Sequence, residues 1–514
     1  RTMALRTIIP GPPGTGKTYR LVNHYLTKEI NDFHTNPKKI VYVTFSNAAA
    51  DEANERIKHP LLYISTLHRL GKRECQIDTE TQLLKDKKWR QFTSQSQICK
   101  GMRFETRKDA YGNTLHLNPH MRIITYARSK KIDLMEAALQ LDLHHSVDLW
   151  LTEQIDEDLQ SYKQQTGMKE FSDMISDFVE EDKRLAVDAV FLDEAQDLSP
   201  LQWDMFFHIE KQCKRSYIAG DDDQTIYDFQ GADPSIFISL KNNNEESFVF
   251  DNQIKSYRVP RKIHAKALEI LKQINERLDK PWEARDEEGT YKENCLLTDF
   301  DFKKNEWMIL AQTNAQLKEP AQHLNNLNLR FKGGQDELLP SGLLDAYGIW
   351  TRLNSGASVS GEEAKYVIKN YFRKKQVKHS FGEGKLLDTV DTITLEELQK
   401  EHGLLVAGSW EQLHMSDEQR SYIKLLLKNG DDLTTDSKIE LSTIHGAKGG
   451  ECKNVILYID FGTEDENNFL SREADKDPDK FHRLYFVGVT RAKQNLYIMQ
   501  STQTNFYNIG YPII

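Results

Sequence analysis

The sequence is poor in cysteine and has no long apolar stretch. Its five cysteines, Cys75, Cys99, Cys213, Cys295 and Cys452, stand far apart, so none belongs to a closely spaced CxxC pair of the metal or redox type. No apolar run approaches the roughly 20 residues needed to cross a bilayer, and the first residues lack the pattern of a secretory signal. We therefore expect reduced thiols, neither zinc nor an iron–sulfur cluster, no membrane partner and a cytoplasmic location.

A strong positive charge is also absent. The net charge is −10 over 514 residues, which argues against non-specific binding of polyanions by the whole surface. Locally, residues 69–131 carry 15 Lys and Arg against 6 Asp and Glu, whereas residues 132–182 carry 2 Lys against 14 Asp and Glu. These segments are either solvated helical faces or, in the basic segment, a nucleic-acid track. The track would comprise Lys85, Lys87, Lys88, Arg90, Arg103, Arg107 and Lys108, with Trp89, Phe92 and Phe104 between them.

Apolar runs of strand length recur along the chain. They cover residues 40–45, 189–193, 215–222, 307–314, 454–460 and 495–500. Such runs, separated by helical stretches, are typical of strands buried on both faces of a parallel sheet. The sequence therefore predicts an α/β fold. Because ligands of these sheets bind beyond the carboxyl ends of the strands, we expect the functional residues just after each run.

Residues 11–18 form a predicted phosphate-binding loop. The stretch "GPPGTGKT" fits the pattern G-x-x-x-x-G-K-[ST], in which backbone N–H groups and the following helix bind phosphates. Lys17 would meet the β- and γ-phosphates, and the Thr18 hydroxyl would bind Mg²⁺. The predicted nucleotide-binding residues of the loop are Gly11, Pro12, Pro13, Gly14, Thr15, Gly16, Lys17 and Thr18.

The stretch "FLDEAQD" at 191–197 supplies the second half of such a site. Asp193, at the end of a buried strand, would hold the Mg²⁺, and Glu194 would be the general base for the attacking water. The other interpretation, an acidic helix N-cap, is disfavoured by the apolar strand before it and by the loop at 11–18. Both motifs together predict a site for a nucleotide with Mg²⁺, and they leave the downstream chemistry open.

Further motifs resemble, in order, those of the superfamily 1A helicases of the UvrD/Rep/PcrA-like group. "DEAQD" is followed by "AGDDDQTIYDFQGADP" (219–234), which resembles motif III of that family. The remaining matches are "VTFSNAAADEANERI" (43–57), "STLHRL" (65–70), "IKSYRVPRKI" (254–263), "ILAQTNAQ" (309–316), "LSTIHGAKGGECKNVIL" (441–457) and "RLYFVGVTRAKQNLYI" (483–498). The resemblance implies two RecA-like parallel-sheet motor domains of the P-loop NTPase type, each with a mainly helical insertion subdomain.

The resemblance also implies a division of the chain. Residues 1–68 and 168–252 would form RecA-like domain 1A, with residues 69–167 as insertion 1B. Residues 253–355 and 436–514 would form RecA-like domain 2A, with residues 356–435 as a reduced insertion 2B. In 2B, the residues Lys365, Lys369 and Arg373 would share one helical face, either solvated or facing phosphates. Since little chain follows the last motif, we expect no carboxy-terminal nuclease domain.

Site residues follow from the same resemblance. Gln224 would contact the γ-phosphate, and Arg258 and Arg491 would act as arginine fingers from the second domain, completing a catalytic set with Lys17, Asp193 and Glu194. Glu451 would face the nucleotide sugar or the γ-phosphate. Single-stranded DNA would stack on aromatic side chains, which accept any base. The implied DNA-binding residues are the stacking residues Phe45 and Phe229, each of which could instead belong to the core, and the backbone contacts Asn47, Thr66, His68, Thr443 and His445.

The family usually carries a glutamine motif before the phosphate loop, and no glutamine precedes the loop here. We therefore expect Tyr257 to stack on the base from the second domain, with Tyr19 or Arg20 beside it. Stacking discriminates poorly among bases, so dATP and, as a weaker expectation, GTP would be accepted alongside ATP.

The implied function is an ATP-dependent 3′–5′ single-stranded DNA translocase and helicase that acts at single-strand/duplex junctions as a monomer. A protein-displacing translocase without strong unwinding stays open, because the second insertion is small. A regulatory partner of a nucleic-acid enzyme also stays open, although an intact catalytic set argues against it. RNA is not excluded as the track, since stacking accepts either sugar, and a protein loading partner is left open.

Overall fold

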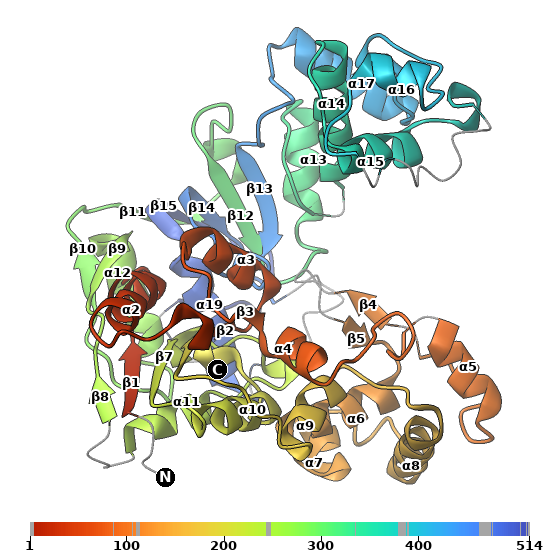
Figure 1. The fold of residues 1–514 in the computed structure, drawn as a ribbon. Helices are drawn as coiled ribbons and strands as arrows, with labels where there is room; N and C mark the ends of the chain where they lie inside the picture. Colours follow the sequence, from red (N-terminus) through yellow and green to blue (C-terminus); the bar gives the residue numbers. More distant parts are fainter. Residues whose placement is uncertain are drawn as a thin grey trace.

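Two parallel β-sheets organise the protein (Figure 1). The computed structural model describes residues 5–85, 87–104, 106–108, 114–242, 248–334, 336–378, 387, 390–461, 474, 476–503, 505–509 and 511. Within these ranges, no helix combines the length and apolar character needed to cross a membrane.

The first sheet has six strands in the order β3-β2-β6-β7-β1-β8, and all neighbours are parallel. Its register places Thr44 beside Asp193 and Pro10 beside Gly220. The carboxyl ends of four strands therefore lie along one edge, where parallel sheets bind ligands. The strands are β1 (Leu5–Pro10), β2 (Ile40–Thr44), β3 (Tyr63–Thr66), β6 (Ala189–Asp193), β7 (Arg215–Gly220) and β8 (Phe248–Phe250).

Helices cover both faces of this sheet. Because successive side chains of a strand point to opposite faces, Ile40 and Tyr42 of β2 join one core cluster and Val41 and Val43 join another. This explains why the strands are apolar throughout. The first face carries α1 (Lys17–Tyr19), the π-helical η1 (Arg20–Leu26), α2 (Thr27–Asn31) and α3 (Asn47–Arg56), and the second carries α4 (Leu67–Glu74), α9 (Asp173–Glu180), α10 (Pro200–Glu210) and α11 (Pro234–Ser239).

The second sheet has five parallel strands in the order β11-β15-β14-β12-β13. They are β11 (Thr290–Cys295), β12 (Trp307–Ala311), β13 (Ile439–Thr443), β14 (Cys452–Leu457) and β15 (Ala492–Met499), with β9 (Lys255–Pro260) and β10 (Glu283–Arg285) paired separately. One face packs on α12 (Arg261–Leu271) and α19 (Pro478–Val489), the other on α13 (Lys318–Asn326). The six predicted apolar runs correspond to β2, β6, β7, β12, β14 and β15, and the predicted α/β class with two parallel sheets is confirmed.

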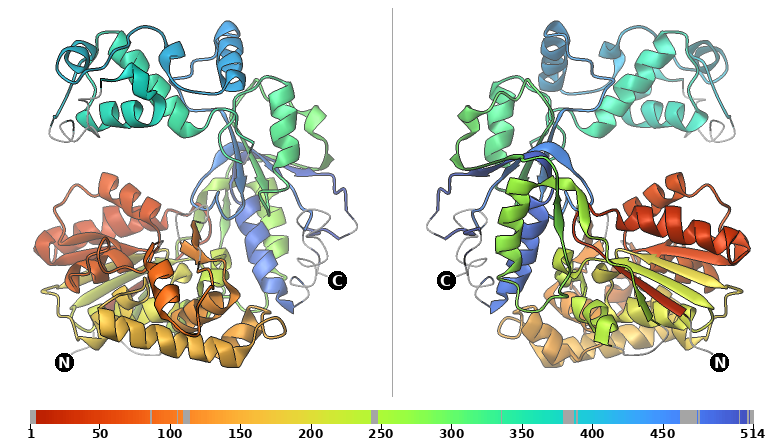
Figure 2. Two further views of the ribbon diagram at one scale, coloured as in Figure 1. Left: turned by 90° about the vertical axis from the view of Figure 1, so that its right-hand side faces the viewer. Right: turned by 90° about the vertical axis from the view of Figure 1, so that its left-hand side faces the viewer.

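Two mainly helical regions interrupt the sheets. The first contains α5 (Lys87–Gln95), β4 (Thr106–Lys108), β5 (Thr114–His116), α6 (Pro119–Lys130), α7 (Leu134–Gln140) and α8 (Leu149–Thr166). The second contains α14 (Ser341–Asn354), α15 (Gly361–Tyr371), α16 (Leu395–Lys400) and α17 (Asp417–Lys428), and it lies beside the second sheet, away from the first (Figure 2). Single helical turns are η2 (Pro37–Lys39), η3 (Ala195–Asp197), η4 (Asp222–Gln224), η5 (Asp228–Gln230), η6 (Leu240–Asn242), η7 (Leu297–Asp299), η8 (Lys374–Gln376) and η11 (Trp410–Gln412).

The structure differs from the sequence-based picture in both helical regions. Trp89, Phe92 and Phe104 are buried together in the core of the first region, so they offer no stacking surface to a nucleic acid. In the second, α15 ends at Tyr371, and Arg373 therefore does not continue the helical face of Lys365 and Lys369. The side chains of Arg107 and Lys108 lie outside the described part of the chain.

The boundary of the second region also differs. The sequence-based division assigns residues up to 355 to the second RecA-like domain. In the structure, the apolar side of α14, including Leu343 and Trp350, packs in a core that extends from Leu339 to Leu433. This core is separate from the clusters on the two faces of the second sheet.

Candidate nucleotide and nucleic-acid site

The loop between β1 and α1 has the backbone geometry of a phosphate cradle. Gly14 and Gly16 have φ angles of 72° and 82°, a left-handed region that glycine enters without steric cost. A Cβ at Gly14 would lie 2.5 Å from Arg258 Cβ, so only glycine allows this approach of β9. The Lys17 ammonium donates to the Gly11 carbonyl at 2.8 Å, which holds it over the loop.

The loop is fastened to β9 by hydrogen bonds. The Tyr257 N–H donates to the Gly14 carbonyl at 2.8 Å, and the Ser256 hydroxyl donates to the Pro13 carbonyl at 2.9 Å. Within the loop, the Thr15 hydroxyl donates to the Pro12 carbonyl at 2.8 Å. The second half of the chain thus contacts the phosphate cradle directly.

Thr18 and Asp193 are brought together at the sheet edge. The Thr18 hydroxyl donates to Asp193 Oδ2 at 2.7 Å, and the Tyr42 hydroxyl donates to the same oxygen at 3.0 Å. Burial, and then the charge of Glu194, raise the pKa of Asp193 to about 6. A hydroxyl and a carboxylate oxygen side by side, with an unfavourable buried charge, fit the oxygen-ligand chemistry of Mg²⁺.

Glu194 follows in a left-handed conformation with φ of 54°. Its Oε2 accepts from Gln196 Nε2 at 2.6 Å, which fixes the orientation of the carboxylate. Burial acts to raise the pKa of Glu194, but Lys17 and Lys448 outweigh it and the pKa is lowered. Glu194 is therefore ionised at neutral pH, as a general base must be.

Arg491 reaches Gln224 from the second sheet. Arg491 Nη2 donates to Gln224 Oε1 at 3.0 Å, and Nη1 donates to the Gly450 carbonyl at 3.1 Å. Burial, and then the charge of Arg258, lower the pKa of Arg491 to about 9, which leaves the guanidinium charged at neutral pH. Gln224 Nε2 donates in turn to Asp221 Oδ2 at 2.7 Å, so both ends of the amide are fixed.

Arg258 is paired with Glu451. Arg258 Nε lies 2.6 Å from Glu451 Oε2, and Lys493 Nζ lies 2.9 Å from Glu451 Oε1. Burial acts to raise the pKa of Glu451, but the two cations lower it overall. Glu451 thus holds Arg258, the other predicted arginine finger, beside the phosphate cradle.

Tyr257 and Tyr19 are exposed to 73% and 68%. Both lie close to Gly16: a Cβ there would be 4.0 Å from Tyr257 Cε2 and 3.9 Å from Tyr19 Cβ. Arg20, in contrast, is turned toward β8, where its Nε donates to Asp251 Oδ2 at 2.7 Å. The two tyrosines therefore offer the free aromatic surface next to the loop.

Four aromatic rings form a continuous cluster beside the carboxyl ends of β2 and β13. Phe45 and Tyr227 stack with a centroid distance of 5.1 Å. Phe229 and His445 meet edge to face at 5.5 Å, and Tyr227 touches both at 6.2 and 6.5 Å. His445 Nε2 lies 3.1 Å from the Ile226 carbonyl, and burial lowers the pKa of His445 to about 4.

The remaining predicted DNA-binding residues lie at strand ends. Asn47 is exposed at the start of α3, and Thr66 accepts from the Arg69 N–H at 3.4 Å as the N-cap of α4. His68 follows in α4, where burial lowers its pKa to about 4. Thr443, the last residue of β13, accepts from the Gly446 N–H at 3.1 Å.

One expectation on position is wrong for the second sheet. Glu451 and Arg491 stand just before β14 and β15, not after them. The contact of Arg491 with Gln224 agrees with this arrangement, because it brings the residue just before β15 to the turn that follows β7.

Sequence reasoning missed several residues of the site. Lys448 is the foremost: its ammonium lies 2.6 Å from Asp197 Oδ1, donates to the Gln224 carbonyl at 2.7 Å and lies 4.8 Å from the centre of the Tyr227 ring. Its place inside the stretch 441–457 was a usable signal. Tyr227 lies inside the stretch 219–234, which was a usable signal of the same kind. Gln196 lies inside the stretch 191–197, which was the same kind of signal, whereas Tyr42 lies within an apolar strand and carries none.

Comparisons with known proteins agree with this geometry. The sequence profile of the UvrD/REP helicase N-terminal domain matches residues 3–245, and that of the UvrD-like helicase C-terminal domain matches residues 408–503. Together these stretches make up more than half of the chain.

Similar whole proteins include helicases of staphylococci. The ATP-dependent DNA helicase PcrA of Staphylococcus aureus strain MRSA252 is 22% identical over 96% of this chain and 81% of its own length. The protein of the same name from Staphylococcus epidermidis is 24% identical over 65% of this chain and 50% of its own length. With both family profiles in their order and the site assembled across two parallel sheets, the chain belongs to the UvrD/Rep/PcrA-like group of superfamily 1A helicases.

Proposed function

We propose that this ATP-hydrolysing DNA helicase moves 3′ to 5′ along single-stranded DNA and couples Mg-ATP hydrolysis to strand movement and duplex unwinding. The observation that carries the coupling of hydrolysis to movement is the contact of Arg491 with Gln224, which joins the two sheets beside the Thr18–Asp193 pair. The 3′–5′ polarity is what the resemblance to the helicase family implies. A cation brought across a domain boundary to the phosphate side is what phosphoryl transfer needs, because negative charge spreads over the transferred group.

Each residue then has a task. Lys17 and the loop N–H groups hold the phosphates, and Glu194 takes the proton of the attacking water. Thr18 and Asp193 would hold Mg²⁺, which when bound supplies positive charge against the phosphate oxygens. Gln224, Arg258 and Arg491 complete the cationic and polar ring around the γ-phosphate. Glu451 would face the nucleotide sugar or the γ-phosphate.

Movement follows from alternation between two states. ATP favours the state in which Arg258 and Arg491 are in place, since these contacts exist only when the two sheets are close. Hydrolysis removes the γ-phosphate and with it the contacts, so the sheets separate. The cluster of Phe45, Tyr227, Phe229 and His445 lies across the same boundary. Its rings would release and regain bases as the boundary opens and closes.

The proposed division into domains 1A (1–68 and 168–252), 1B (69–167), 2A (253–355 and 436–514) and 2B (356–435) fits this scheme. The separate cores on the two sheets and in the two helical regions support it. The packing of α14 in the last of these cores favours moving the start of 2B to about residue 339.

The test is an ATPase and unwinding assay with defined strands. We expect single-stranded DNA to stimulate hydrolysis and a 3′-tailed duplex, but not a 5′-tailed one, to be unwound. Unwinding from 5′ tails would contradict the polarity. Protein displacement without unwinding would favour the translocase alternative, and stimulation by RNA in place of DNA would change the track.

A companion variant separates hydrolysis from binding. Lys17→Ala removes the ammonium from the phosphate cradle, so hydrolysis should fall to background while single-stranded DNA still binds. Unchanged turnover in Lys17→Ala would contradict the assignment of the site.

A further inference from the structure

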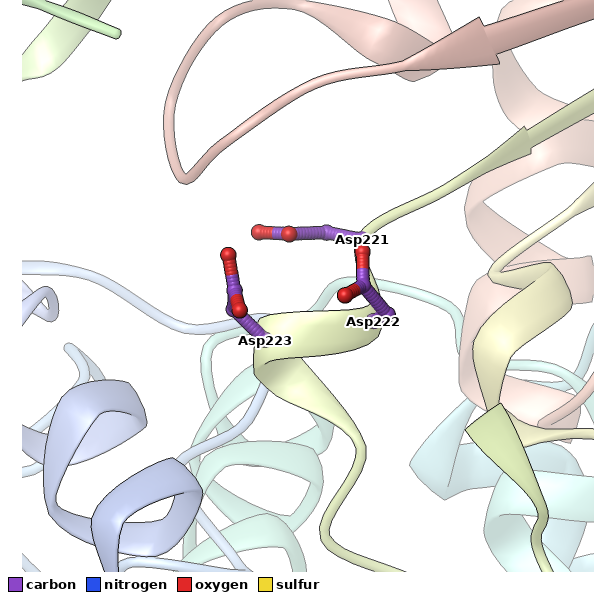
Figure 3. Close-up of side chains that lie close together, drawn as sticks. All are labelled: Asp221, Asp222 and Asp223. Atoms are coloured by element: carbon purple, nitrogen blue, oxygen red, sulfur yellow. The ribbon is translucent and has the colours of Figure 1, made fainter. Parts of the chain in front are cut away.

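Three consecutive aspartates, Asp221, Asp222 and Asp223, are fully buried just after β7 (Figure 3). Burial of three carboxylates is unfavourable unless cations lie close. Among the described residues, these three aspartates form the one cluster of three or more His, Cys, Asp or Glu side chains whose ligand atoms lie close enough together to hold a metal ion. The ammonium of Lys280 already supplies the positive charge there. Its Nζ lies 2.9 Å from Asp221 Oδ1 and 3.0 Å from Asp223 Oδ2, and it also contacts Asp222.

Lys280 belongs to a segment that connects the two motor halves. This segment, residues 275–280, follows α12; we call it the bridge. Ile274, just before it, packs in the core between the second sheet and α12. Leu278, within it, packs in a core of the first sheet, and its N–H donates to Asp222 Oδ2 at 2.7 Å. The bridge is thus anchored by apolar and polar contacts in the opposite half.

The start of α19 holds the other side of the bridge. The N–H groups of Asn275 and Glu276 donate to the Asp479 carboxylate at 3.0 and 3.1 Å. Arg483, one turn further along α19, donates to the Glu276 carbonyl. The same helix ends at Val489, two residues before Arg491. One helix therefore carries the bridge at its start and Arg491 at its end.

A chain of polar contacts leads from Lys280 back to Arg491. Lys280 Nζ lies 2.9 Å from Asp221 Oδ1, and the other oxygen of Asp221 accepts from Gln224 Nε2 at 2.7 Å. Gln224 Oε1 accepts from Arg491 Nη2 at 3.0 Å. Because a planar amide cannot turn without breaking one of these bonds, the orientation of Asp221 determines where Gln224 holds the guanidinium.

We propose that Lys280 is a positioning residue for ATP hydrolysis. Its ammonium fixes Asp221, Asp221 fixes the Gln224 amide, and Gln224 holds Arg491 at the phosphate side. Lys280 is 1% exposed as a side chain and does not itself reach the nucleotide. The inference rests on the proposed roles of Gln224 and Arg491. It adds that the positions of these two side chains depend on Lys280 and therefore on the bridge.

The chain offers a matched control in Arg277. Arg277 also joins the bridge to the aspartates, but its hydrogen bonds go to Asp223, at 2.9 and 2.7 Å, and its charge acts more on Asp223 than on Asp222 or Asp221. Loss of Arg277 weakens the same connection between the halves without touching the path to Arg491. A general loosening of the bridge would affect both variants equally.

The test compares Lys280→Met, Lys280→Arg and Arg277→Met by kcat and KM of the DNA-stimulated ATPase. A misplaced catalytic contact can cost up to about a hundredfold in rate, so we expect Lys280→Met to lower kcat at least tenfold with KM for ATP changed less than threefold. Lys280→Arg should restore most of kcat, and Arg277→Met should keep it. Equal loss of kcat in Lys280→Met and Arg277→Met, or none in either, would overturn the proposal.

Lys280→Met leaves three buried carboxylates with one cation, so the variant can fail to fold. Lys280→Met combined with Asp222→Asn removes one charge of each sign and keeps the net charge of the cluster. This pair should fold, as thermal unfolding will report, and should still show the low kcat. Wild-type kcat in the folded pair would also overturn the proposal.

A double-mutant cycle separates the two levels of the argument. If Lys280 acts through Arg491, then Arg491→Gln should lower kcat strongly and Lys280→Met should add little to it. If the effects of the two substitutions on kcat add fully, Lys280 does not act through Arg491. If Arg491→Gln itself leaves kcat unchanged, the proposed function of the arginine is wrong, whatever Lys280 does.

Discussion

Asp197 is a buried carboxylate that holds Lys448 across the boundary between the two sheets. Burial is the largest influence on it and raises its pKa to about 7, with Lys448 acting against this and Glu194 acting with it. In the unfolded chain an aspartate has a pKa of about 3.9. The folded protein therefore binds this proton more tightly, and the contribution of Asp197 to stability is lost as the pH rises from about 4 to about 7.

Asp197→Asn removes this titration. At pH 5 the carboxyl of Asp197 is protonated, so the uncharged amide of the variant should leave its stability close to that of the wild type. Between pH 5 and 7 the free energy of unfolding of the wild type should fall relative to that of the variant, by up to about 2 kcal/mol. Denaturant titrations at pH 5, 6, 7 and 8 measure this, and parallel profiles would refute the raised pKa.

At the residue scale, the sequence predicted those site residues whose functional partners lie only a few positions away in the sequence. The stretch 11–18 joins β1 to α1, and the stretch 191–197 runs from the end of β6 into η3, so the chemistry of each can be read from a few adjacent letters. Tyr42 binds Asp193 across 151 residues, and Lys280 meets Asp222 across 58. Such pairs depend on how the two sheets meet, and no local pattern encodes that.

At the scale of elements, the strands that could be predicted are those buried on both faces. β2, β6 and β12 are buried throughout, so they read as unbroken apolar runs. β9 and β11 have exposed residues in their interior, and β8 has three residues, so none of them stands out from a loop. The π-helical η1 was not predictable either, because its apolar residues also suit an ordinary α-helix.

The aromatic cluster is the element-scale candidate for the grip on DNA. Stacking of a base on an aromatic side chain is worth about 1–3 kcal/mol, so Phe45→Ala and Phe229→Ala should each weaken binding of a single strand about tenfold. Fluorescence anisotropy with a labelled oligonucleotide measures the affinity.

Phe250→Ala is the control for surface loss. Phe250 is an exposed phenylalanine of the edge strand β8, outside the aromatic cluster, and its variant should bind DNA as the wild type does. Equal affinity of all three variants would assign Phe45 and Phe229 to the core rather than to the track.

At the scale of the whole molecule, the exposed aromatic surface beside the phosphate loop comes from both halves. Tyr19 follows the phosphate loop and Tyr257 belongs to β9, so a stacked base would be held between them. Tyr257→Ala should raise KM for ATP about tenfold, whereas Tyr257→Phe keeps the ring and should stay near the wild type. Because both tyrosines offer ring faces, dATP should be hydrolysed with a KM close to that of ATP, and strict adenine selectivity in a competition with GTP would reveal a further contact.

Ile226, Tyr227 and Ala232 come from the first half of the chain, yet they are buried in the core of the second sheet. During synthesis the first half emerges earlier, since the sheet that covers these residues is built mainly from the last part of the sequence. Domains of a growing chain generally fold as they appear. This loop must therefore stay exposed until the strands and helices that cover it have been synthesised. Cutting the gene between the two halves would leave each fragment with an exposed apolar surface that is prone to aggregation. The two halves therefore need one another for folding as well as for catalysis.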